Sequence, residues 1–407
     1  MSDAEIELDA WEHEDHRAIA NRMALFHQQA EGPGMVFWHP RGFALYQVVE
    51  DYMRRHMRRA GFREIRTPQL LSRGLWERSG HWQKFGANMF AVDDGGQALA
   101  LKPMSCPGHI QVFNKRRRSY RDLPMRLNEF GACHRNEPSG ALNGLLRSRA
   151  FVQDDAHIFC SEAQIEAEVT RFCRLLSAIY RDFGFVEPRV GFATRPAVRA
   201  GSDAVWDQAE AALEAAAGNA GLKFVLDEGE GAFYGPKLDF ALRDSRDRLW
   251  QCGTVQLDLV LPERLDVGYI DADGQRRRPV LLHQAVFGSL ERFIGILLEH
   301  YQGKLPLWLA PEQVLVASVG TDQAVVDHAQ AVAGELEEAG FRVAVDVSRA
   351  RLARKIVDAR QAGIARVAVI GPEEARDLTV SLRGQLPQPR SPSVARVIEL
   401  LRPEAFR

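Results

Sequence analysis

The pattern of apolar residues changes at a short proline-containing segment, residues 304–311, and this change restricts the chain to two architectures in succession. Before the segment, helical runs alternate with strand-like runs that are mainly linked as hairpins. This pattern is typical of an α+β domain with a large, mainly antiparallel sheet flanked by helices. After it, continuous apolar strands alternate with helices, which predicts a small α/β domain with a mostly parallel sheet. A length of 407 residues accommodates both domains.

Two strand-like runs, residues 125–134 and 150–159, are joined by a polar, arginine-rich loop and predict a long hairpin. The other predicted elements follow from helical or alternating spacing. Helices are expected at residues 15–29, 43–59, 162–182, 205–218, 290–301, 326–340 and 349–363, and strands at 62–71 (broken at Pro68), 237–244, 248–262, 279–288, 314–320, 341–347 and 365–371.

Several functional classes lack their motifs in this sequence. It contains no GxxxxGK[ST] loop, no GxSxG elbow and no HExxH motif, so a P-loop site, an ordinary serine hydrolase and a zincin are not expected. No apolar run reaches the roughly 20 residues that span a bilayer, and the acidic start does not resemble a signal peptide. The five cysteines form no CxxC pair. We therefore expect a cytoplasmic protein with reduced thiols and no membrane partner. The net charge of -2 neither indicates nor excludes a nucleic-acid partner.

Polar and charged side chains cluster at the ends of the two hairpin strands, in place of the ordinary residue pattern of a strand. His134, Arg135 and Glu137 end the first strand, and Arg147 and Arg149 precede the second. A solvated hairpin face would explain such residues. An ATP site is the alternative, because a guanidinium plane stacks on a base and its fork binds phosphate oxygens. Spacing alone leaves both interpretations open.

Three segments resemble the motifs of class II aminoacyl-tRNA synthetases. FGACHRNEPSG with RSRAFVQDDAHIF (residues 130–140 and 147–159) resembles motif 2, and VFGSLERFIGILLEH (286–300), which contains Arg292, resembles motif 3. The helix at 43–59 and the strand ending at Pro68 resemble motif 1, the dimer interface of that class. Within the class, further strings are similar to threonyl-tRNA synthetases, namely GMVFWHPRG, SGHW, LKPMSCPGHI, QDDAHIFC, GEGAFYGPK, WQCGTVQLD and GSLERFIGIL.

The resemblance implies one zinc ion per chain, bound by Cys106, His157 and His283. These residues are far apart in sequence, and no spacing rule would select them. Three protein ligands leave an open coordination position, as in a catalytic rather than a structural zinc site. Threonine and valine are nearly isosteric, and a metal chelated by the α-amine and β-hydroxyl of threonine would reject valine.

The resemblance also implies roles in threonine binding and catalysis. Arg135 matches the family arginine that touches the α-phosphate and the threonine carboxylate. Asp155 matches the aspartate that accepts the hydroxyl proton, and Tyr234 and Gln153 match side chains around the amino group. His81 matches a histidine that helps the tRNA ribose hydroxyl attack the adenylate.

For ATP, the resemblance places Arg292 against the γ-phosphate and the adenine, and Glu137 at the adenine amine. Gln251 is expected near the ribose, and Arg147 also in the ATP site. Mg²⁺ accompanies ATP in this class. Its ligands would be mostly phosphate oxygens and acidic residues that the sequence does not identify.

As a whole, the resemblance predicts a homodimeric ligase that joins L-threonine to tRNA using ATP. The expected domains are an N-terminal extension (1–34), a catalytic domain (35–305) and an anticodon-binding-like domain (311–407). Only about 34 residues precede GMVFWH, so the domain of the family that hydrolyses seryl-tRNA is expected to be absent. Two alternatives remain: a paralogue serving a biosynthetic or resistance pathway, and a non-catalytic tRNA-binding relative.

The chain departs from the usual family sequence in ways that affect tRNA reading. Ser105, Asn143, Ala150 and Gln284 replace the usual asparagine, histidine, glycine and arginine. The basic strand near the C-terminus, something like RTRRGK, is replaced by LTVSLRGQLPQPRSPS, whose cations are Arg383 and Arg390. Weakened or altered anticodon reading is one expectation. The alternative is that other cations supply the contacts, namely Arg349, Arg351, Arg354 and Lys355.

Overall fold

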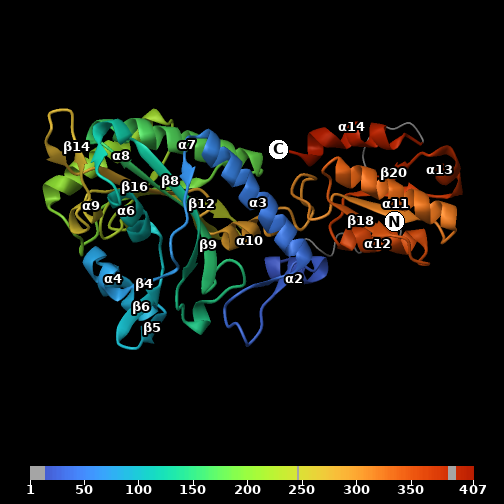
Figure 1. The fold of residues 1–407 in the computed structure, drawn as a ribbon, viewed down its shortest axis with the longest axis horizontal. Coiled ribbons are helices and arrows are strands. Elements are labelled where there is room, and N and C mark those ends of the chain that lie inside the picture. Colours follow the sequence, from blue (N-terminus) through green and yellow to red (C-terminus); the bar gives the residue numbers. More distant parts are fainter. Residues whose placement is uncertain (1–13, 245–246, 384–390) are drawn as a thin grey trace. The chain divides into compact units, whose positions relative to one another are not determined.

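The computed structural model describes residues 14–244, 247–383 and 391–407 (Figure 1). The chain divides into two compact units. The larger unit comprises residues 28–36 and 53–297, and the smaller unit contains the remaining described residues. The sequence-based domain ranges of 1–34, 35–305 and 311–407 are retained as a proposal. No helix in the described ranges is long and apolar enough to cross a membrane.

An eight-stranded sheet organises the larger unit (Figure 1). Its neighbouring strands are antiparallel except for the two edge pairs, β10 with β11 and β3 with β8. The large, mainly antiparallel sheet predicted from sequence is therefore confirmed. In spatial order the strands are β11 (Val225–Asp227), β10 (Arg189–Ala193), β12 (Lys237–Arg243), β13 (Leu249–Asp258), β16 (Val280–Ala285), β9 (Ala150–Cys160), β8 (Met125–His134) and β3 (Arg63–Glu64).

Helix α7 (Ile165–Asp182) contacts both the sheet and the segment that precedes α10 (Leu290–His300). The buried Tyr180 hydroxyl accepts a hydrogen bond from the Gly253 N–H (2.9 Å) and donates one to the Val286 carbonyl oxygen (2.7 Å). The other α-helices before residue 301 are α2 (His16–Met23), α3 (Pro40–Arg59), α4 (Arg73–Ser79), α5 (His81–Phe85), α6 (Cys106–Asn114), α8 (Asp203–Asn219), α9 (Leu261–Arg264) and α10 (Leu290–His300), and short 3-10 helices lie at Gly86–Asn88, Tyr120–Asp122, Ser139–Ala141 and Glu162–Gln164. Helix α2 and most of α3 belong to the smaller unit.

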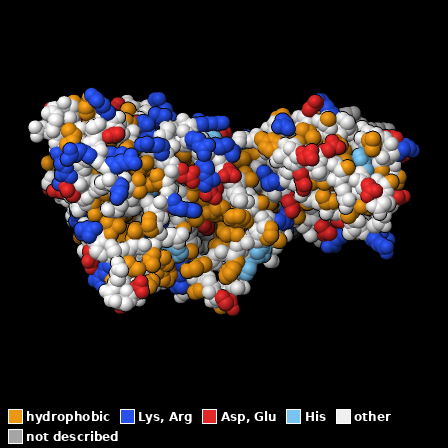
Figure 2. Space-filling model, viewed as in Figure 1, with side chains coloured by type: hydrophobic (Ala, Val, Ile, Leu, Met, Phe, Trp, Pro, Cys, Tyr) orange, Lys and Arg blue, Asp and Glu red, His pale blue; other side chains and the backbone are white. Residues whose placement is uncertain are grey.

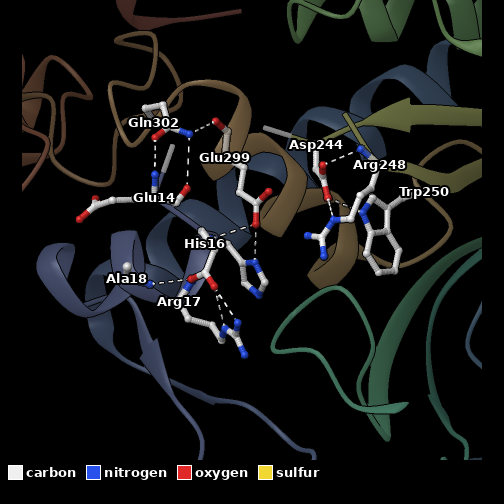
Figure 3. Close-up of polar contacts among 10 residues, drawn as sticks. Glu14, His16, Arg17, Ala18, Asp244, Arg248, Trp250, Glu299 and Gln302 are labelled. Carbon is white, nitrogen blue, oxygen red and sulfur yellow. Dashed lines mark hydrogen bonds and ion pairs between the residues drawn. The ribbon is translucent and has the colours of Figure 1, made fainter. Parts of the chain in front are cut away.

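Buried polar contacts fix two local features (Figure 3). Helix α2 is anchored by His16, whose backbone N–H and ring Nδ1 lie 3.1 and 2.8 Å from Glu299 Oε1. In the turn between β12 and β13, the buried Asp244 carboxylate accepts hydrogen bonds from the Arg248 backbone N–H (2.9 Å), the Arg248 Nε (2.6 Å) and the Trp250 indole (2.8 Å).

Two sequence-based predictions were wrong in extent. The helix expected at 15–29 ends at Met23, because Ala24 adopts a left-handed conformation (φ 53°) and Phe26–His27 form β1, which pairs with β2 (Phe37–Trp38). The strand expected at 62–71 is divided between β3 and β4 (Leu70–Ser72), which belong to different sheets. The remaining small sheets contain β4, β6 (Gln97–Leu101) and β5 (Ala91–Asp94), and β15 (Arg276–Arg277), β14 (Tyr269–Ile270) and β7 (Arg118–Ser119).

The smaller unit contains the predicted mostly parallel sheet, with helices on both faces. Strand β17 (Val314–Ser318) is parallel to β18 (Val343–Asp346) and β19 (Arg366–Ile370), and β20 (Ser381–Arg383) is antiparallel to β19. Val314 and Val316 pack with α11 and α14, while Leu315 and Ala317 pack with α12. The helices are α11 (Gln323–Glu338), α12 (Leu352–Gln361), α13 (Pro372–Asp377) and α14 (Val394–Ala405). Arg390 lies outside the described residues.

Candidate active site and metal centre

A cavity of about 560 Å³ opens in the larger unit beside β8, β9, β13 and the start of α10. Residues far apart in sequence meet there because the sheet places motif 2 and motif 3 on neighbouring strands. Seven of the residues selected from sequence line the cavity, namely Arg135, Glu137, Arg147, Gln153, Tyr234, Gln251 and Arg292. Cys106, His81, Asp155, His157 and His283 do not line it.

Strand β9 sends alternate side chains in two directions. Gln153, Asp155 and His157 share one face of the strand, as period-two alternation requires. Asp154 faces the other way, and its carboxylate accepts hydrogen bonds of 2.8 Å from the backbone N–H groups of three residues before α10, namely Val286, Phe287 and Gly288. Burial raises the pKa of Asp154 to about 7, although these hydrogen bonds act to lower it. Asp154 therefore attaches motif 3 to motif 2.

Three buried residues that can bind a metal converge next to the cavity. One ligand atom from each of Cys106, His157 and His283 lies within 4.8 Å of the others. Cys106 begins α6, while His157 and His283 are direct partners across β9 and β16. The ring of Tyr234, which lines the cavity, stacks on His283 with centroids 4.9 Å apart. The register of two strands thus creates a Cys–His–His group that sequence spacing does not reveal.

The group fits a zinc ion. His157 Nε2 and His283 Nδ1 lie 3.0 Å apart, and the other nitrogen of His283 donates to Asp258 Oδ2 at 2.9 Å. Such a carboxylate behind a histidine is the usual support for a metal ligand. Burial, followed by repulsion from Asp155 and Asp258, raises the pKa of the Cys106 thiol well above its usual range. Burial also lowers the pKa of His157 well below its usual range. A cation would stabilise the thiolate, and neutral imidazoles are the form that binds metals.

Positive side chains outnumber acidic ones in the cavity wall. Arg135 lies over the Phe151 ring at 5.1 Å and donates to the Pro103 carbonyl oxygen at 3.3 Å. Arg292 donates to the carbonyl oxygens of Leu146 (2.9 Å) and Gln251 (2.8 Å). These backbone contacts fix both guanidinium groups without neutralising them. The cavity is therefore suited to an anion with several charges, such as a triphosphate.

Glu137 and Arg147 contact each other in the motif 2 loop. Arg147 Nη2 and Nε lie 2.8 and 3.2 Å from Glu137 Oε2. Arg147 is largely exposed, so this pair is weakly held and can rearrange around a ligand. Gln251 donates to Asp239 Oδ1 at 2.6 Å. Gln153 lines the cavity with a buried Oε1 that has no hydrogen-bond partner in the described chain. An unpartnered buried acceptor fits a ligand with a donor such as an ammonium group.

Asp155 and His81 lie deeper than the cavity wall. The Ser105 N–H donates to Asp155 Oδ2 at 3.3 Å, and burial raises the pKa of that carboxyl group. His81 is fully buried, with Nδ1 2.8 Å from Ser79 Oγ and Nε2 3.7 Å from Cys106 Sγ. Burial, with a smaller effect of nearby cations, lowers the pKa of His81 to about 3. Its ring is therefore neutral in neutral solution.

The sequence interpretation missed several residues that belong to this region. Lys237, Lys84, Thr254 and Gln256 also line the cavity. Lys237 ends the GEGAFYGPK string, so its position beside Tyr234 was an available signal. Asp258 ends the WQCGTVQLD string, but only the pairing of β13 with β16 reveals that it supports His283.

Comparisons with known proteins agree with this geometry. Residues 88–301 match the family described as "tRNA synthetase class II core domain (G, H, P, S and T)", and residues 313–385 match "Anticodon binding domain". The chain is 56% identical over 373 residues to a threonine--tRNA ligase of Caulobacter sp. (strain K31), covering 91% of this chain and 56% of the relative. It is 55% identical over 379 residues to one of Acidiphilium cryptum (strain JF-5), covering 93% and 59%. The chain thus spans less than three-fifths of the length of these relatives.

Solved structures give the same assignment. The RNA binding domain of threonyl-tRNA synthetase from Cryptosporidium parvum Iowa II superposes with a TM-score of 0.93 at 41% identity, covering 97% of this chain and 99% of that one. ThrRS-1 from Aeropyrum pernix superposes with a TM-score of 0.82 at 30% identity, covering 96% and 94%. The chain therefore belongs to the threonyl-tRNA synthetase family of class II aminoacyl-tRNA synthetases.

Proposed function

We propose that this chain activates L-threonine with ATP to form threonyl-adenylate and transfers the threonyl group to tRNA(Thr). The observation that carries the proposal is a buried Cys–His–His group that contacts Tyr234 through His283, while Tyr234 itself lines a cavity with several cations. Charging of a tRNA(Thr) transcript with radiolabelled threonine tests it. Failure to charge this transcript in the presence of zinc, Mg²⁺ and ATP would contradict the proposal.

In the first step the threonine carboxylate attacks the α-phosphorus of ATP, and the bond to the pyrophosphate oxygen breaks. Arg135 would contact both the carboxylate and the α-phosphate, and would offset their mutual repulsion and the charge that develops during attack. Arg292 is held by two carbonyl oxygens and would stabilise the leaving pyrophosphate. Glu137 would accept from the adenine amine, and Gln251 would lie near the ribose. Mg²⁺ would accompany ATP, mainly on phosphate oxygens.

Selection of threonine over valine depends on the metal centre in this proposal. Cys106, His157 and His283 would hold one zinc ion per chain, and that ion would act as a Lewis acid toward the amine and β-hydroxyl of threonine. Asp155 would accept the hydroxyl proton in a hydrogen bond, and Gln153 Oε1 and Tyr234 would face the amine. Valine would leave these buried polar groups without partners and is therefore strongly disfavoured.

In the second step the terminal ribose hydroxyl of tRNA attacks the threonyl carbonyl carbon and AMP leaves. We propose that His81 assists this attack, as in the family. Its neutral ring provides an acceptor nitrogen, but it lies behind the cavity wall and 3.7 Å from Cys106 Sγ. Entry of the tRNA end would have to bring the hydroxyl to this ring.

Serine is expected to be activated detectably, because it retains the amine and the hydroxyl. Loss of one methyl group costs about 1–3 kcal/mol, or roughly 10–200-fold in kcat/KM. We propose that the 407-residue chain does not itself hydrolyse seryl-tRNA, since its residues 88–301 and 313–385 match the synthetase core and the anticodon-binding domain. Charging tRNA(Thr) with serine and following its decay checks this. Deacylation accelerated by the enzyme would refute it.

Dimerisation is expected through motif 1. Phe43 on α3 is 47% exposed, and Pro68 is also exposed, so both can contribute to an interface between copies of the chain. Tyr52, further along α3, is fully buried against Trp308 in its own chain and so does not contribute to such an interface. Mass measurement in solution should give a homodimer. A stable, active monomer would contradict this proposal.

Location in the cytoplasm is part of the proposal. All five cysteines are free and buried, as expected of a protein that works in a reducing compartment.

Anticodon reading is proposed to be weaker than usual in the family. From Ala310 to Arg407 there are 13 Lys and Arg residues against 13 Asp and Glu residues, so this region has no net positive charge. The alternative basic surface, formed by Arg349, Arg351, Arg354 and Lys355, has fewer unpaired cations than its sequence indicates. Lys355 is buried and donates to the carbonyl oxygens of Ser318 (3.0 Å) and Asp346 (2.8 Å), and Arg354 pairs with Asp358.

Substitution of one anticodon base is therefore expected to lower kcat/KM by no more than about 5–160-fold, which corresponds to about 1–3 kcal/mol for one lost base contact. The measurement is charging of tRNA(Thr) and its anticodon variants at fixed salt, because phosphate contacts make affinity depend on salt. A loss of many hundred-fold would show that the smaller unit reads the anticodon in the usual way.

A further inference from the structure

A line of buried polar side chains runs from Lys102 to the metal centre. Lys102 Nζ lies 2.9 Å from Glu129 Oε1, Glu129 Oε2 lies 3.2 Å from His109 Nε2, and His109 Nδ1 lies 2.9 Å from His157 Nδ1. Each of these residues is at most 2% exposed. Burying a lysine, a carboxylate and two histidines together is costly unless every group is paired.

The hydrogen bonds around the Glu129 carboxylate fix which group donates and which accepts. Glu129 accepts hydrogen bonds from Lys102, from the Thr67 N–H (2.8 Å), from the Thr67 hydroxyl (2.8 Å) and from His109 Nε2. Four donors occupy the acceptor sites of an ionised carboxylate. Glu129 can therefore only accept, and His109 must carry a proton on Nε2.

The same direction of hydrogen bonding extends from His109 to the proposed metal ligand His157. When His157 binds a metal through Nε2, its remaining proton is on Nδ1. His109 Nδ1 is 2.9 Å away and can accept that proton in a hydrogen bond, whereas Asp155 Oδ1 is 3.9 Å away, which is too far. Asp258 supports His283 in the same way from the other side.

We propose that His109, backed by Glu129 and Lys102, is a positioning residue that holds His157 in the tautomer able to bind zinc. This inference rests on the proposed zinc site. It also explains the order of residues in α6. Cys106 and His109 are three positions apart and share a face of that helix, so one helix provides a metal ligand and the support for another.

Three variants test this role. His109→Leu removes both hydrogen bonds, and zinc affinity measured by chelator competition should fall about 10–100-fold. His109→Asn keeps an acceptor near the position of Nδ1 and should recover most of that affinity. Phe113→Leu opens a cavity one turn along α6, where Phe113 stacks on Phe159, and should leave zinc affinity unchanged. Melting temperatures verify that each variant folds.

A second readout uses cobalt(II) in place of zinc. The visible absorption spectrum of the cobalt-substituted His109→Leu variant should differ from that of the parent, while the Phe113→Leu spectrum should match it. Equal zinc affinity in His109→Leu and the parent would overturn the proposal, as would an equal loss in Phe113→Leu. A parent protein that binds no zinc would instead count against the proposed function.

A different observation concerns a basic segment at the end of α6. Five of the seven residues from 115 to 121 are Lys or Arg, and we call Lys115, Arg116, Arg117, Arg118 and Arg121 the arginine surface. Arg118 is partly buried and donates to the Phe113 carbonyl oxygen (3.0 Å). Lys115, Arg116, Arg117 and Arg121 are exposed. Figure 2 shows many Lys and Arg side chains at the end of the larger unit that carries β14.

The cations at the start of this surface are not neutralised. Lys115, Arg116 and Arg117 have no ion pair with any described residue, whereas the neighbouring Arg276 and Arg277 pair with Asp266 and with Asp271 and Asp273, respectively. A hollow of about 650 Å³ lies beside them, lined in part by Arg116, Arg117, Arg118, Tyr269 and Arg276. Adjacent free cations around a hollow are complementary to a phosphate backbone.

We infer that the arginine surface binds the phosphate backbone of tRNA, outside the catalytic cavity. This inference also rests on the proposed function. The Arg116→Ala/Arg117→Ala double variant should raise the KM for tRNA(Thr), and the slope of log(kcat/KM) against log[salt] should fall by about 1–2. ATP–pyrophosphate exchange, which needs no tRNA, should be unchanged.

The matched control is Arg243→Ala/Arg277→Ala. It also removes two exposed arginines, but both are paired, Arg243 with Asp247 and Arg277 with Asp273. It should change the KM for tRNA by less than the test variant does. An unchanged KM and salt slope in Arg116→Ala/Arg117→Ala would overturn the inference, as would equal effects in the two double variants. If the parent protein itself shows no ATP–pyrophosphate exchange, that result would count against the proposed function instead.

Discussion

Replacing Cys106 by alanine is expected to remove the zinc ion and lower threonine activation by roughly 10³-fold, since a catalytic metal contributes several kcal/mol. The physical reason is that two imidazoles cannot by themselves replace a thiolate ligand, and threonine then loses the partner for its amine and hydroxyl. Metal content by elemental analysis and ATP–pyrophosphate exchange with threonine measure the two effects.

The control for this prediction is Cys173→Ala. Cys173 is also fully buried, but it lies on α7 and outside the Cys–His–His group. The control should keep one zinc ion per chain and should keep threonine activation if it folds. Metal-free Cys106→Ala protein that activates threonine at the parent rate would refute the zinc assignment.

Replacing Arg135 by alanine is expected to lower the rate of adenylate formation by about 10²–10³-fold, because it removes a fixed donor from the site where charge develops. Arg135→Lys should restore little of the rate, since an ammonium group lacks the planar fork that can contact two oxygen groups at once. Exchange kinetics with varied ATP and varied threonine separate a loss of rate from a loss of binding.

Arg243→Ala is a suitable comparison for Arg135→Ala. Arg243 is exposed and pairs with Asp247 away from the cavity lining, so its loss should leave exchange kinetics close to those of the parent. Unchanged kinetics in Arg135→Ala would show that the cavity does not bind the reacting phosphate as proposed.

The strands of the motif 2 hairpin were predictable because their apolar and polar residues alternate. Predicted and observed ends agree within one residue for β8 and β9. Helix α2 was predicted too long because the left-handed conformation of Ala24 leaves no clear trace in the residue pattern. Lys355 was assigned to a basic surface because helical spacing gives a direction for its side chain but not the element that covers it.

The metal centre could be reached from sequence only through family resemblance. His157 and His283 are 126 positions apart, and the register of β9 with β16 brings them together. The residue pattern alone does not reveal the side chains that support these two histidines. In the sequence, Glu129 does not differ from any other polar residue in a strand. Only the folded structure shows that it accepts hydrogen bonds from Lys102, Thr67 and His109.

The most direct test of the central claim is ATP–pyrophosphate exchange by the purified chain with each amino acid in turn. Exchange is expected with threonine, at a rate roughly 10–200-fold lower with serine, and at a far lower rate with valine. Removal of zinc is expected to abolish the exchange with threonine. Exchange that favours another amino acid, or threonine-dependent exchange that persists at full rate without zinc, would contradict this claim.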